Sequence, residues 1–262
     1  MKKLYKYIIV ICLSAVYIAI SDLALPLSEL AYGTGCCTVT GRYLPVAVDG
    51  PPWVIAIDPG HGGTDTGALA ITAEYKVIDT TASFLYGLLD DDMDFIPVYT
   101  RTDTDPSSRD RAAAANRAGA ALLISIHANS DSSSASHGFE CFPSPPGRTY
   151  HTDSLRLATI IAREMKTAGQ TLRGGEEKTG VKYAYYYGNN KKIVDSNDDT
   201  VRSRKSFGVL EKSACPAVLV EQCFITNRND VAQWASEKGC LKAAGIYYSA
   251  IKQYFSAFSD KI

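Results

Sequence analysis

The chain has 262 residues, and 46% of them are hydrophobic, which is enough for one sizeable core. Its 27 basic residues nearly balance its 28 acidic residues, so no strong electrostatic attraction to nucleic acid is expected. No internal repeat at the periods of solenoid proteins is evident. The composition therefore indicates an ordinary globular protein and argues against nucleic acid as a partner.

The first residues have the pattern of an export signal. Lys2, Lys3 and Lys6 precede an apolar run over residues 7–20, which is short for a membrane-spanning helix. A charged start and a short apolar core are typical of a secretory signal peptide, and an uncleaved anchor is the alternative. We expect residues 1–21 to be a signal peptide or N-terminal anchor. The protein is then exported: secreted, or associated with the cell wall or membrane on the extracytoplasmic side.

Residues 22–52 mix Pro, Gly, Ser and Thr with few periodic runs, which predicts a linker or irregular lead-in. The seven cysteines of an exported chain favour at least one disulfide, whose connectivity the sequence does not give. The adjacent Cys36 and Cys37 are expected to pair elsewhere rather than with each other. Because the chain has no CxxC pair, we expect no metal site built on cysteine.

A histidine follows the first predicted strand. The four apolar residues 54–57 predict a buried strand, and Asp58, Pro59 and Gly60 then turn the chain before His61. Open α/β sheets place their sites at this end of a strand. A solvated histidine in a tight turn is the alternative. A phosphate-binding loop fits poorly, since neither GxGxxG nor GK[ST] is present.

A helix is predicted to begin at Glu74, because apolar residues recur at helical spacing from there to Leu89. An acidic residue in a first turn is commonly explained by the helix dipole, and the alternative is a metal ligand that faces His61. The next elements are a strand over residues 95–100, a helix over residues 108–118 with Ser107 as its N-cap, and a strand over residues 120–126.

His127 ends that strand, as His61 ends the first one. If the two strands are parallel neighbours in one sheet, both imidazoles lie at the same edge. With Glu74 they supply two histidines and one glutamate, a set typical of catalytic zinc sites that keep a fourth position open for water. The other histidines, His137 and His151, are interpreted as surface or substrate-side residues.

The second half of the chain contributes one more candidate. Strands are predicted over residues 138–142 and 215–220, and helices over residues 153–168 and 236–255. Residues 171–206 are predicted to be irregular, with tyrosines that either line a sugar or peptide groove or belong to an edge strand and pack on the surface. Glu221 ends the last strand, where a carboxylate is costly unless it is paired or used. Near a metal it could take a proton from water.

A nucleophilic serine or cysteine is the competing enzyme class. Ser125 and Cys223 are candidates by location only, because neither has a sequence-evident base and no G-x-S-x-G elbow is present. Asp58 is expected either to accept a hydrogen bond from a zinc-binding histidine or simply to form the turn.

Together these blocks resemble the zinc-dependent N-acetylmuramoyl-L-alanine amidases of the Amidase_3 family. The matching segments are VIAIDPGHGGTDTGA, Glu74, TRTD followed by RAAAAN and ALLISIHANS, the GFE strand and CPAVLVEQCFITN. They extend across nearly all of residues 53–256. The resemblance implies a single α/β domain over residues 53–258. Its fold would be a mixed six-stranded sheet flanked by helices, zinc-exopeptidase-like (phosphorylase/hydrolase-like).

The resemblance also implies that His61, Glu74 and His127 bind one Zn²⁺ per chain and that Glu221 is the catalytic carboxylate. The family reaction cleaves the amide between N-acetylmuramic acid and the L-alanine of the stem peptide, with zinc-activated water and a glutamate as general base and acid. The expected partner is bacterial peptidoglycan, both glycan strand and stem peptide. We expect a monomer that meets a membrane only through an uncleaved N-terminal segment.

Two other functions stay open beside this one. The chain could be a catalytically silent, exported cell-wall-binding or regulatory protein on an amidase scaffold, or a zinc peptidase with another amide substrate. Three departures from the family pattern concern substrate preference more than reaction type. Thr179 stands where the family often has arginine, Gln222 and Cys223 stand where it commonly has Leu-Gly, and an asparagine usual after Glu74 is absent.

Overall fold

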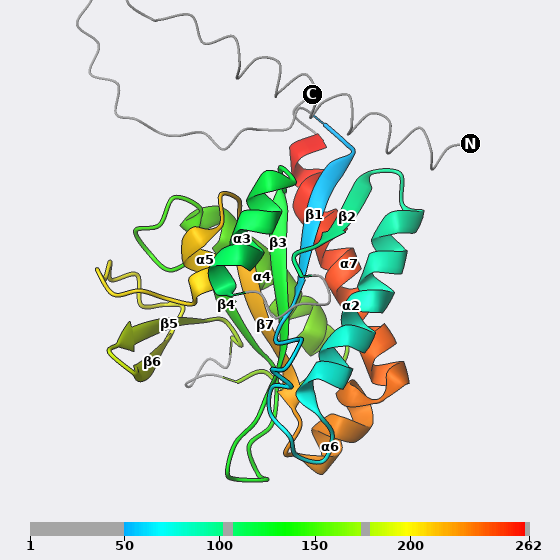
Figure 1. Ribbon diagram of the computed structural model, residues 1–262, viewed down its shortest axis with the longest axis vertical. Coiled ribbons are helices and arrows are strands. Elements are labelled where there is room, and N and C mark those ends of the chain that lie inside the picture. Colours follow the sequence, from blue (N-terminus) through cyan, green and yellow to red (C-terminus); the bar gives the residue numbers. More distant parts are fainter. Residues whose placement is uncertain (1–49, 102–106, 174–178, 260–262) are drawn as a thin grey trace, which may run out of the picture. The chain divides into compact units, whose positions relative to one another are not determined.

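The centre of the fold is a mixed five-stranded sheet of order β2-β1-β3-β7-β4 (Figure 1). The computed structural model describes residues 50–101, 107–173 and 179–259. Four strands are parallel, and β4 runs antiparallel to β7 at one edge. The strands are β1 (Trp53–Pro59), β2 (Phe95–Tyr99), β3 (Leu122–Asn129), β4 (Glu140–Pro143) and β7 (Ala217–Phe224). The carboxyl ends of β1 and β3 therefore meet at one edge, as predicted.

Helices cover both faces of this sheet. Figure 1 shows α2 (Glu74–Asp91) and α7 (Glu237–Ser259) on one side, and α3 (Ser108–Arg117) and α5 (Gly208–Lys212) on the other. Helix α4 (His151–Thr167) packs against α7 and β4. The short helix α6 (Arg228–Asp230) and the π-helix η1 (Val231–Ala235) lead from β7 into α7. The predicted α/β domain with helices on a mixed sheet is thus confirmed.

The expected number of strands was wrong for the described part of the chain, where the sheet has five strands rather than six. Beyond β4 the next described residues contribute isolated bridges, between Phe139 and Leu172 and between Cys141 and Val181. From Lys182 onward the backbone pairs with a different strand, so it is not available to extend the sheet. The sixth position is therefore held by isolated bridges instead of a strand.

Alternation along the strands divides the interior into two cores. Ile55 and Ile57 pack into the larger core with α2, α4 and α7, whereas Ala56 packs into the smaller core with α3 and α5. In β3 and β7, Leu123 and Leu219 face the smaller core. His127 and Glu221 continue these two series, because side chains on one face recur at every second residue. Both polar groups therefore lie on the α3 and α5 face, where the strands reach their carboxyl ends.

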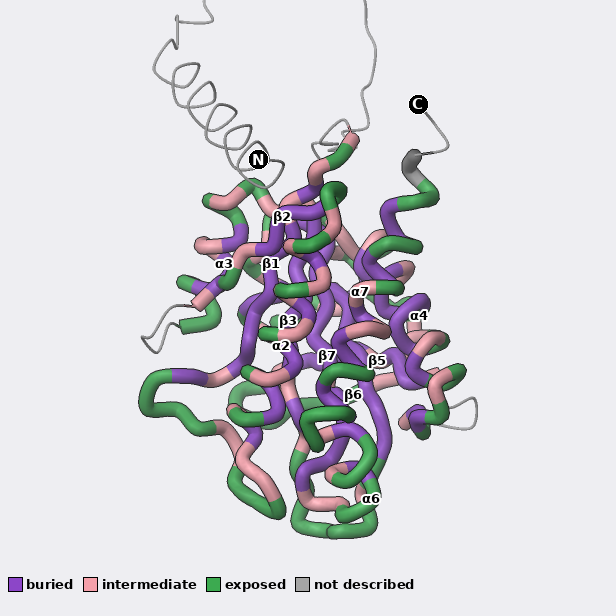
Figure 2. Tube along the Cα trace, turned by 90° about the vertical axis from the view of Figure 1, so that its right-hand side faces the viewer, coloured by how far each residue is buried: buried purple, intermediate pink, exposed green. Residues whose placement is uncertain are grey.

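The segment predicted to be irregular contains a β-hairpin, β5 (Lys182–Tyr187) and β6 (Asn190–Asp195). Tyr183 and Tyr185 are fully buried, while Tyr187 is exposed, so these tyrosines lie on a strand, but the first two do not pack on its surface as the edge-strand alternative expected. Figure 2 shows the exposed outer part of this hairpin against the buried central strands. The sequence does not indicate this hairpin, because β6 carries exposed polar residues and has no apolar alternation.

The four cysteines that the structure describes have free, buried thiols: Cys141, Cys215, Cys223 and Cys240. The expected disulfide is thus not formed among them, and Cys12, Cys36 and Cys37 lie outside the described residues. The predicted signal peptide or anchor over residues 1–21 also lies outside them, as does nearly all of the lead-in. Within the described residues, no helix has the length and apolar character needed to cross a membrane.

Candidate metal centre

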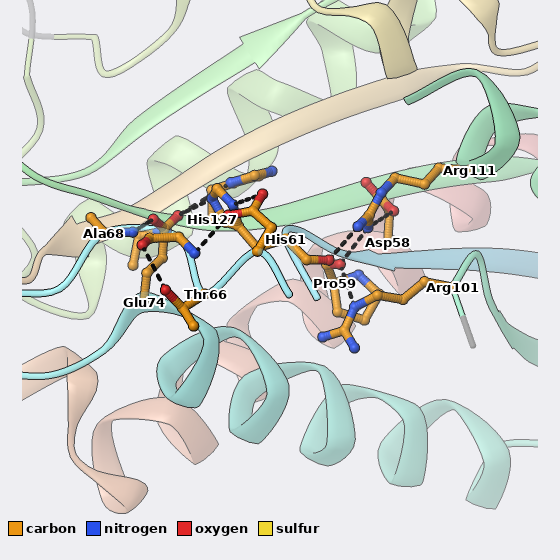
Figure 3. Close-up of polar contacts among 12 residues, drawn as sticks. Asp58, Pro59, His61, Thr66, Ala68, Glu74, Arg101, Arg111 and His127 are labelled. Carbon is orange, nitrogen blue, oxygen red and sulfur yellow. Dashed lines mark hydrogen bonds and ion pairs between the residues drawn. The ribbon is translucent and has the colours of Figure 1, made fainter. Parts of the chain in front are cut away.

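Three predicted ligands converge at the carboxyl edge of the sheet. His61 follows β1, His127 lies in β3 and Glu74 is the first residue of α2. One ligand atom from each lies within 4.8 Å of the other two, and within the described residues this is the group suited to hold a metal ion. Figure 3 shows the three side chains pointing toward one another. Both histidines are about one-fifth exposed, so the group is accessible from solvent.

The Glu74 carboxylate is the centre of this group. Its Oε1 lies 3.1 Å from Nε2 of His61 and 3.3 Å from Nδ1 of His127. Backbone amides of Ala68 and Ala128 also donate to the two carboxylate oxygens, at 2.9 and 3.1 Å. Burial acts to raise the pKa of Glu74, but the hydrogen bonds from His127 and His61 hold it well below its usual value. The carboxylate is therefore ionised, as a metal ligand must be.

His61 is oriented by a second carboxylate. Its Nδ1 lies 2.8 Å from Oδ2 of Asp65, while Nε2 faces Glu74. A proton held on Nδ1 by Asp65 leaves Nε2 free to bind a cation, a common arrangement for metal-binding histidines. The hydrogen bond to Glu74 raises the pKa of His61 to about 9. Protons and a metal ion therefore compete for this nitrogen.

The backbone around His61 is held in an unusual conformation. His61 has a φ of 57°, in the left-handed region that non-glycine residues seldom occupy. The buried Arg111 guanidinium donates to the carbonyl oxygens of His61 and Pro59 and to the Asp58 carboxylate (Figure 3). Arg101 also donates to the Pro59 carbonyl, at 2.9 Å. These cationic side chains lock the loop that presents His61.

Two glycines allow the loop to close around the ligands. A Cβ at Gly60 would lie 2.2 Å from the His127 ring, which is far inside contact distance. A Cβ at Gly67 would lie 2.7 Å from Oε2 of Glu74 and 2.8 Å from Cδ2 of His61. Gly67 also has a φ of 64°, which suits glycine. The absence of a side chain at these two positions thus leaves the room that the three ligand side chains occupy.

Asp58 does not contact a histidine, so the expected hydrogen bond to a metal ligand was wrong. Its carboxylate accepts hydrogen bonds from Ser125 at 2.6 Å, from Arg111 at 3.0 Å and from Thr100. The group is buried and satisfied by these partners. Asp58 therefore supports the site through Arg111 and the loop backbone, and Asp65 takes the role beside His61.

Glu221 lies next to the metal-ligating group. Its Cα is in register with that of His127 on β3 and with that of Glu140 on β4. Burial raises the pKa of Glu221 to about 7, against an opposing effect of His127. Its Oε2 is buried and has no hydrogen-bond partner among the described residues. A carboxylate with such a pKa and a free oxygen is suited to accept and return a proton near neutral pH.

A cavity of about 360 Å³ opens beside these groups. Its polar wall includes His61, His127 and Glu221, and its apolar wall includes Phe207 and Leu219. A molecule in this cavity would thus contact both the candidate ligands and the candidate proton acceptor. We call it the metal-site cavity.

The competing nucleophiles are poorly placed. Ser125 donates its hydroxyl hydrogen to Asp58, and its Oγ is buried. Cys223 is fully buried, and burial raises its pKa well above the usual value. The remaining histidines are outside the ligand group: His137 contacts the carbonyl oxygen of Ala135, and His151 that of Ser144. The serine and the cysteine therefore do not provide an alternative nucleophile, and the two histidines do not belong to the metal-ligating group.

Fold and site together define a class: an α/β domain with a candidate catalytic metal centre of two histidines and one glutamate, set beside a proton-accepting carboxylate. The family described as N-acetylmuramoyl-L-alanine amidase, Amidase_3, matches residues 55–253. The chain belongs to this family. The resemblance seen in the sequence is thereby confirmed.

Individual relatives agree with this assignment. The N-acetylmuramoyl-L-alanine amidase LytC of Bacillus subtilis is 30% identical over 77% of this chain and 35% of its own length. A probable amidase, AmiB of Haemophilus influenzae, is 28% identical over 80% of this chain and 54% of its own. This chain thus spans about a third to a half of the length of these curated relatives.

Solved structures share the fold. The catalytic domain of the amidase CwlV from Bacillus (Paenibacillus) polymyxa has 27% identity and a TM-score of 0.61, and the match covers 78% of this chain and 98% of that domain. An N-acetylmuramoyl-L-alanine amidase from Clostridium difficile 630 has 25% identity and a TM-score of 0.63, covering 79% and 98%. The described α/β domain therefore corresponds to a whole amidase domain.

Proposed function

We propose that this chain is a zinc-dependent peptidoglycan hydrolase that cleaves the amide between N-acetylmuramic acid and the L-alanine of the stem peptide. The observation that carries the proposal is the convergence of His61, Glu74 and His127 beside Glu221, in a domain that matches the amidase family. Two imidazoles and one carboxylate are a usual ligand set for catalytic zinc.

In this proposal His61, Glu74 and His127 hold one Zn²⁺ per chain. The fit is supported by the donor set, by the ionised Glu74 and by the glycines that leave room for the two rings. When bound, Zn²⁺ lowers the pKa of a water molecule and polarises the scissile carbonyl. Asp65 keeps the His61 ring oriented through its Nδ1.

Glu221 acts as the general base and acid. Its carboxylate accepts a proton from the attacking water and returns it to the nitrogen of the leaving L-alanine. A pKa raised to about 7 by burial suits both directions of this transfer at neutral pH. Its unpartnered Oε2 is the atom available for the proton.

We further propose that the enzyme acts outside the cytoplasm, as a monomer, with residues 1–21 as its signal peptide or N-terminal anchor. The substrate lies in the cell wall, and one similar protein from Bacillus anthracis is named as a cell wall amidase. The N-terminal sequence has the charged start and short apolar run of an export signal.

The test is digestion of purified peptidoglycan, with mass analysis of the released products, with and without a chelator. We expect free stem peptides with an N-terminal alanine, lost on chelation and restored by zinc. Release of other fragments would point to another bond. Binding of zinc and peptidoglycan without any release would indicate a wall-binding or regulatory role.

A further inference from the structure

A second cavity lies beyond Glu221, on the side away from the metal ligands. Its volume is about 400 Å³, and three basic side chains line it: Arg173, Lys182 and Lys191. We call it the basic groove. Lys182 comes from β5 and Lys191 from β6, so the hairpin forms one wall, while Asn129 at the end of β3 and Glu140 on β4 line it from the sheet.

The acidic residues that line this groove neutralise some of its basic side chains but not all of them. Glu140 accepts from Lys182 at 2.6 Å, from Arg173 at 3.1 Å and from Asn129 at 2.9 Å, so both of its oxygens are engaged. The oxygens of Asp131 accept hydrogen bonds from three serines of its own loop: Ser132, Ser133 and Ser136. Asp195 is the third acid of the lining.

Lys191 is the cation that these acids leave available. The side chain is exposed, and it forms no hydrogen bond or ion pair with the residues that the structure describes. Its ammonium lies 5.5 Å from the ring centroid of Phe207, which lines the metal-site cavity. The positive charge of Lys191 also acts to lower the pKa of Glu221. Lys191 therefore stands where the basic groove meets the metal-site cavity.

The order of the polar residues across the sheet shows on which side of Glu221 the basic groove lies. His127, Glu221 and Glu140 are in register on β3, β7 and β4. Glu221 thus lies between the candidate metal ligands on one side and Glu140 with the basic groove on the other. A carboxylate that returns a proton to the leaving amine must reach that amine. In the proposed reaction the leaving amine lies at Glu221, and the basic groove is the neighbouring cavity on the side away from the metal ligands.

We propose that the basic groove binds a free carboxylate of the leaving stem peptide, with Lys191 as its principal contact. This inference rests on the proposed function, because it takes the peptide as the leaving group. In stem peptides the residue after L-alanine is a glutamate linked through its side chain, and its α-carboxyl is either free or amidated. A carboxylate at this point is within reach of a cation just beyond Glu221. The groove then selects the acidic form of the peptide.

The experiment compares two muropeptides that differ only in this carboxyl, free or amidated. The full zinc-loaded chain and its Lys191→Glu variant are assayed, with Lys192→Glu as the matched control. Lys192 is the neighbouring exposed lysine on β6 and does not line the groove. We expect Lys191→Glu to raise KM for the acidic muropeptide by about fivefold or more, as loss and reversal of an exposed charge contact would. The KM for the amidated muropeptide stays unchanged, a change of kcat caused by the effect of this charge on Glu221 is the same for both muropeptides, and Lys192→Glu behaves as wild type.

An equal rise of KM for both muropeptides, or the same KM in the Lys191→Glu and Lys192→Glu proteins, would overturn the inference while leaving the proposed function intact. Absence of cleavage by wild type would instead refute the proposed function. In that case the proposed role of the groove is tested by binding. Wild type, Lys191→Glu and Lys192→Glu are each titrated with the free acidic tripeptide and with its amidated form. Weaker binding of the acidic tripeptide to Lys191→Glu alone supports the groove, and equal binding to all three proteins overturns it.

Discussion

The two sides of Glu221 are built differently. On the metal side, ligands come from the end of one buried strand, the interior of another and the start of a helix, and buried Arg111 fixes the intervening loop. On the groove side, the basic residues come from the β5–β6 hairpin and the segment before it, whose described backbone joins the sheet through isolated bridges. The candidate metal centre thus lies on the core, whereas the basic groove is bounded by the hairpin.

The departures from the family pattern are found on both sides. Thr179 lies three residues before the start of the hairpin, on the groove side. Gln222 and Cys223 instead lie in the core, where the Gln222 amide donates to the Trp234 carbonyl at 2.7 Å and Cys223 is fully buried. None of these positions contributes a candidate ligand or the proton acceptor.

The largest effect is expected from the loss of a ligand on the metal side. His127→Ala removes one of three donors, so zinc content falls to near zero and amide hydrolysis is lost with it. Metal analysis of the purified variant and the product assay measure both. His137→Ala is the matched control, because His137 is exposed and outside the ligand group. Full zinc content in His127→Ala would refute the ligand assignment.

The second-largest effect is expected from a substitution that removes the proton acceptor and keeps all three metal ligands. Glu221→Gln keeps the size of the side chain but removes its ability to accept a proton. We expect kcat to fall by about 10²–10⁴-fold, the usual range for loss of a general acid–base group. Zinc content should stay at one per chain. Near wild-type turnover in this variant would show that another group moves the proton.

The convergence of the metal-side candidates could be predicted from the sequence for a physical reason. His61 follows an apolar strand, His127 and Glu221 lie in the carboxyl-terminal parts of two others, and parallel strands bring these parts to one edge. The role of Asp65 was missed, although a carboxylate four residues after His61 in a turn is a local signal. Arg111 was beyond reach, because its contacts join helix α3 to a loop about fifty residues earlier.

The groove side could not be predicted in the same way. Lys191 lies in a strand without apolar alternation, and the contact between Lys182 and Glu140 depends on the isolated bridges that hold this segment beside β4. Side-chain pairing between such distant residues leaves no periodic signal. The tyrosines gave an ambiguous pattern for the same reason, since burial of Tyr183 and Tyr185 depends on what packs around the hairpin.

A smaller effect is expected from a substitution of Arg111, which fixes the loop that presents His61. Arg111→Lys keeps the positive charge but cannot donate to Asp58, Pro59 and His61 together, because lysine lacks the planar fork of arginine. We expect zinc affinity to fall by about 10–100-fold, as for other residues that orient metal ligands. Competition with a fluorescent chelator measures this. Arg109→Lys, an exposed change on the same helix, should leave the affinity as in wild type. Equal affinity in both variants would contradict the role of Arg111.

The smallest effect is expected on the groove side. Lys182→Met removes one cation from the basic groove and leaves Glu140 bonded to Arg173 and Asn129. KM for the acidic muropeptide should rise by about two- to fivefold, in the range of a partly exposed ion pair. Zinc content and kcat should be unchanged. A loss of zinc in this variant would show that the two sides are not independent.

The most direct test of the metal centre is a crystal structure of the zinc-loaded protein, with diffraction data collected on both sides of the zinc absorption edge. We predict one anomalous peak per chain, about 2.0–2.2 Å from one nitrogen each of His61 and His127 and from an oxygen of Glu74. A carboxylate oxygen of Glu221 should lie outside direct bonding distance of the peak. An anomalous peak at any other set of side chains, or direct coordination by Glu221, would contradict the account.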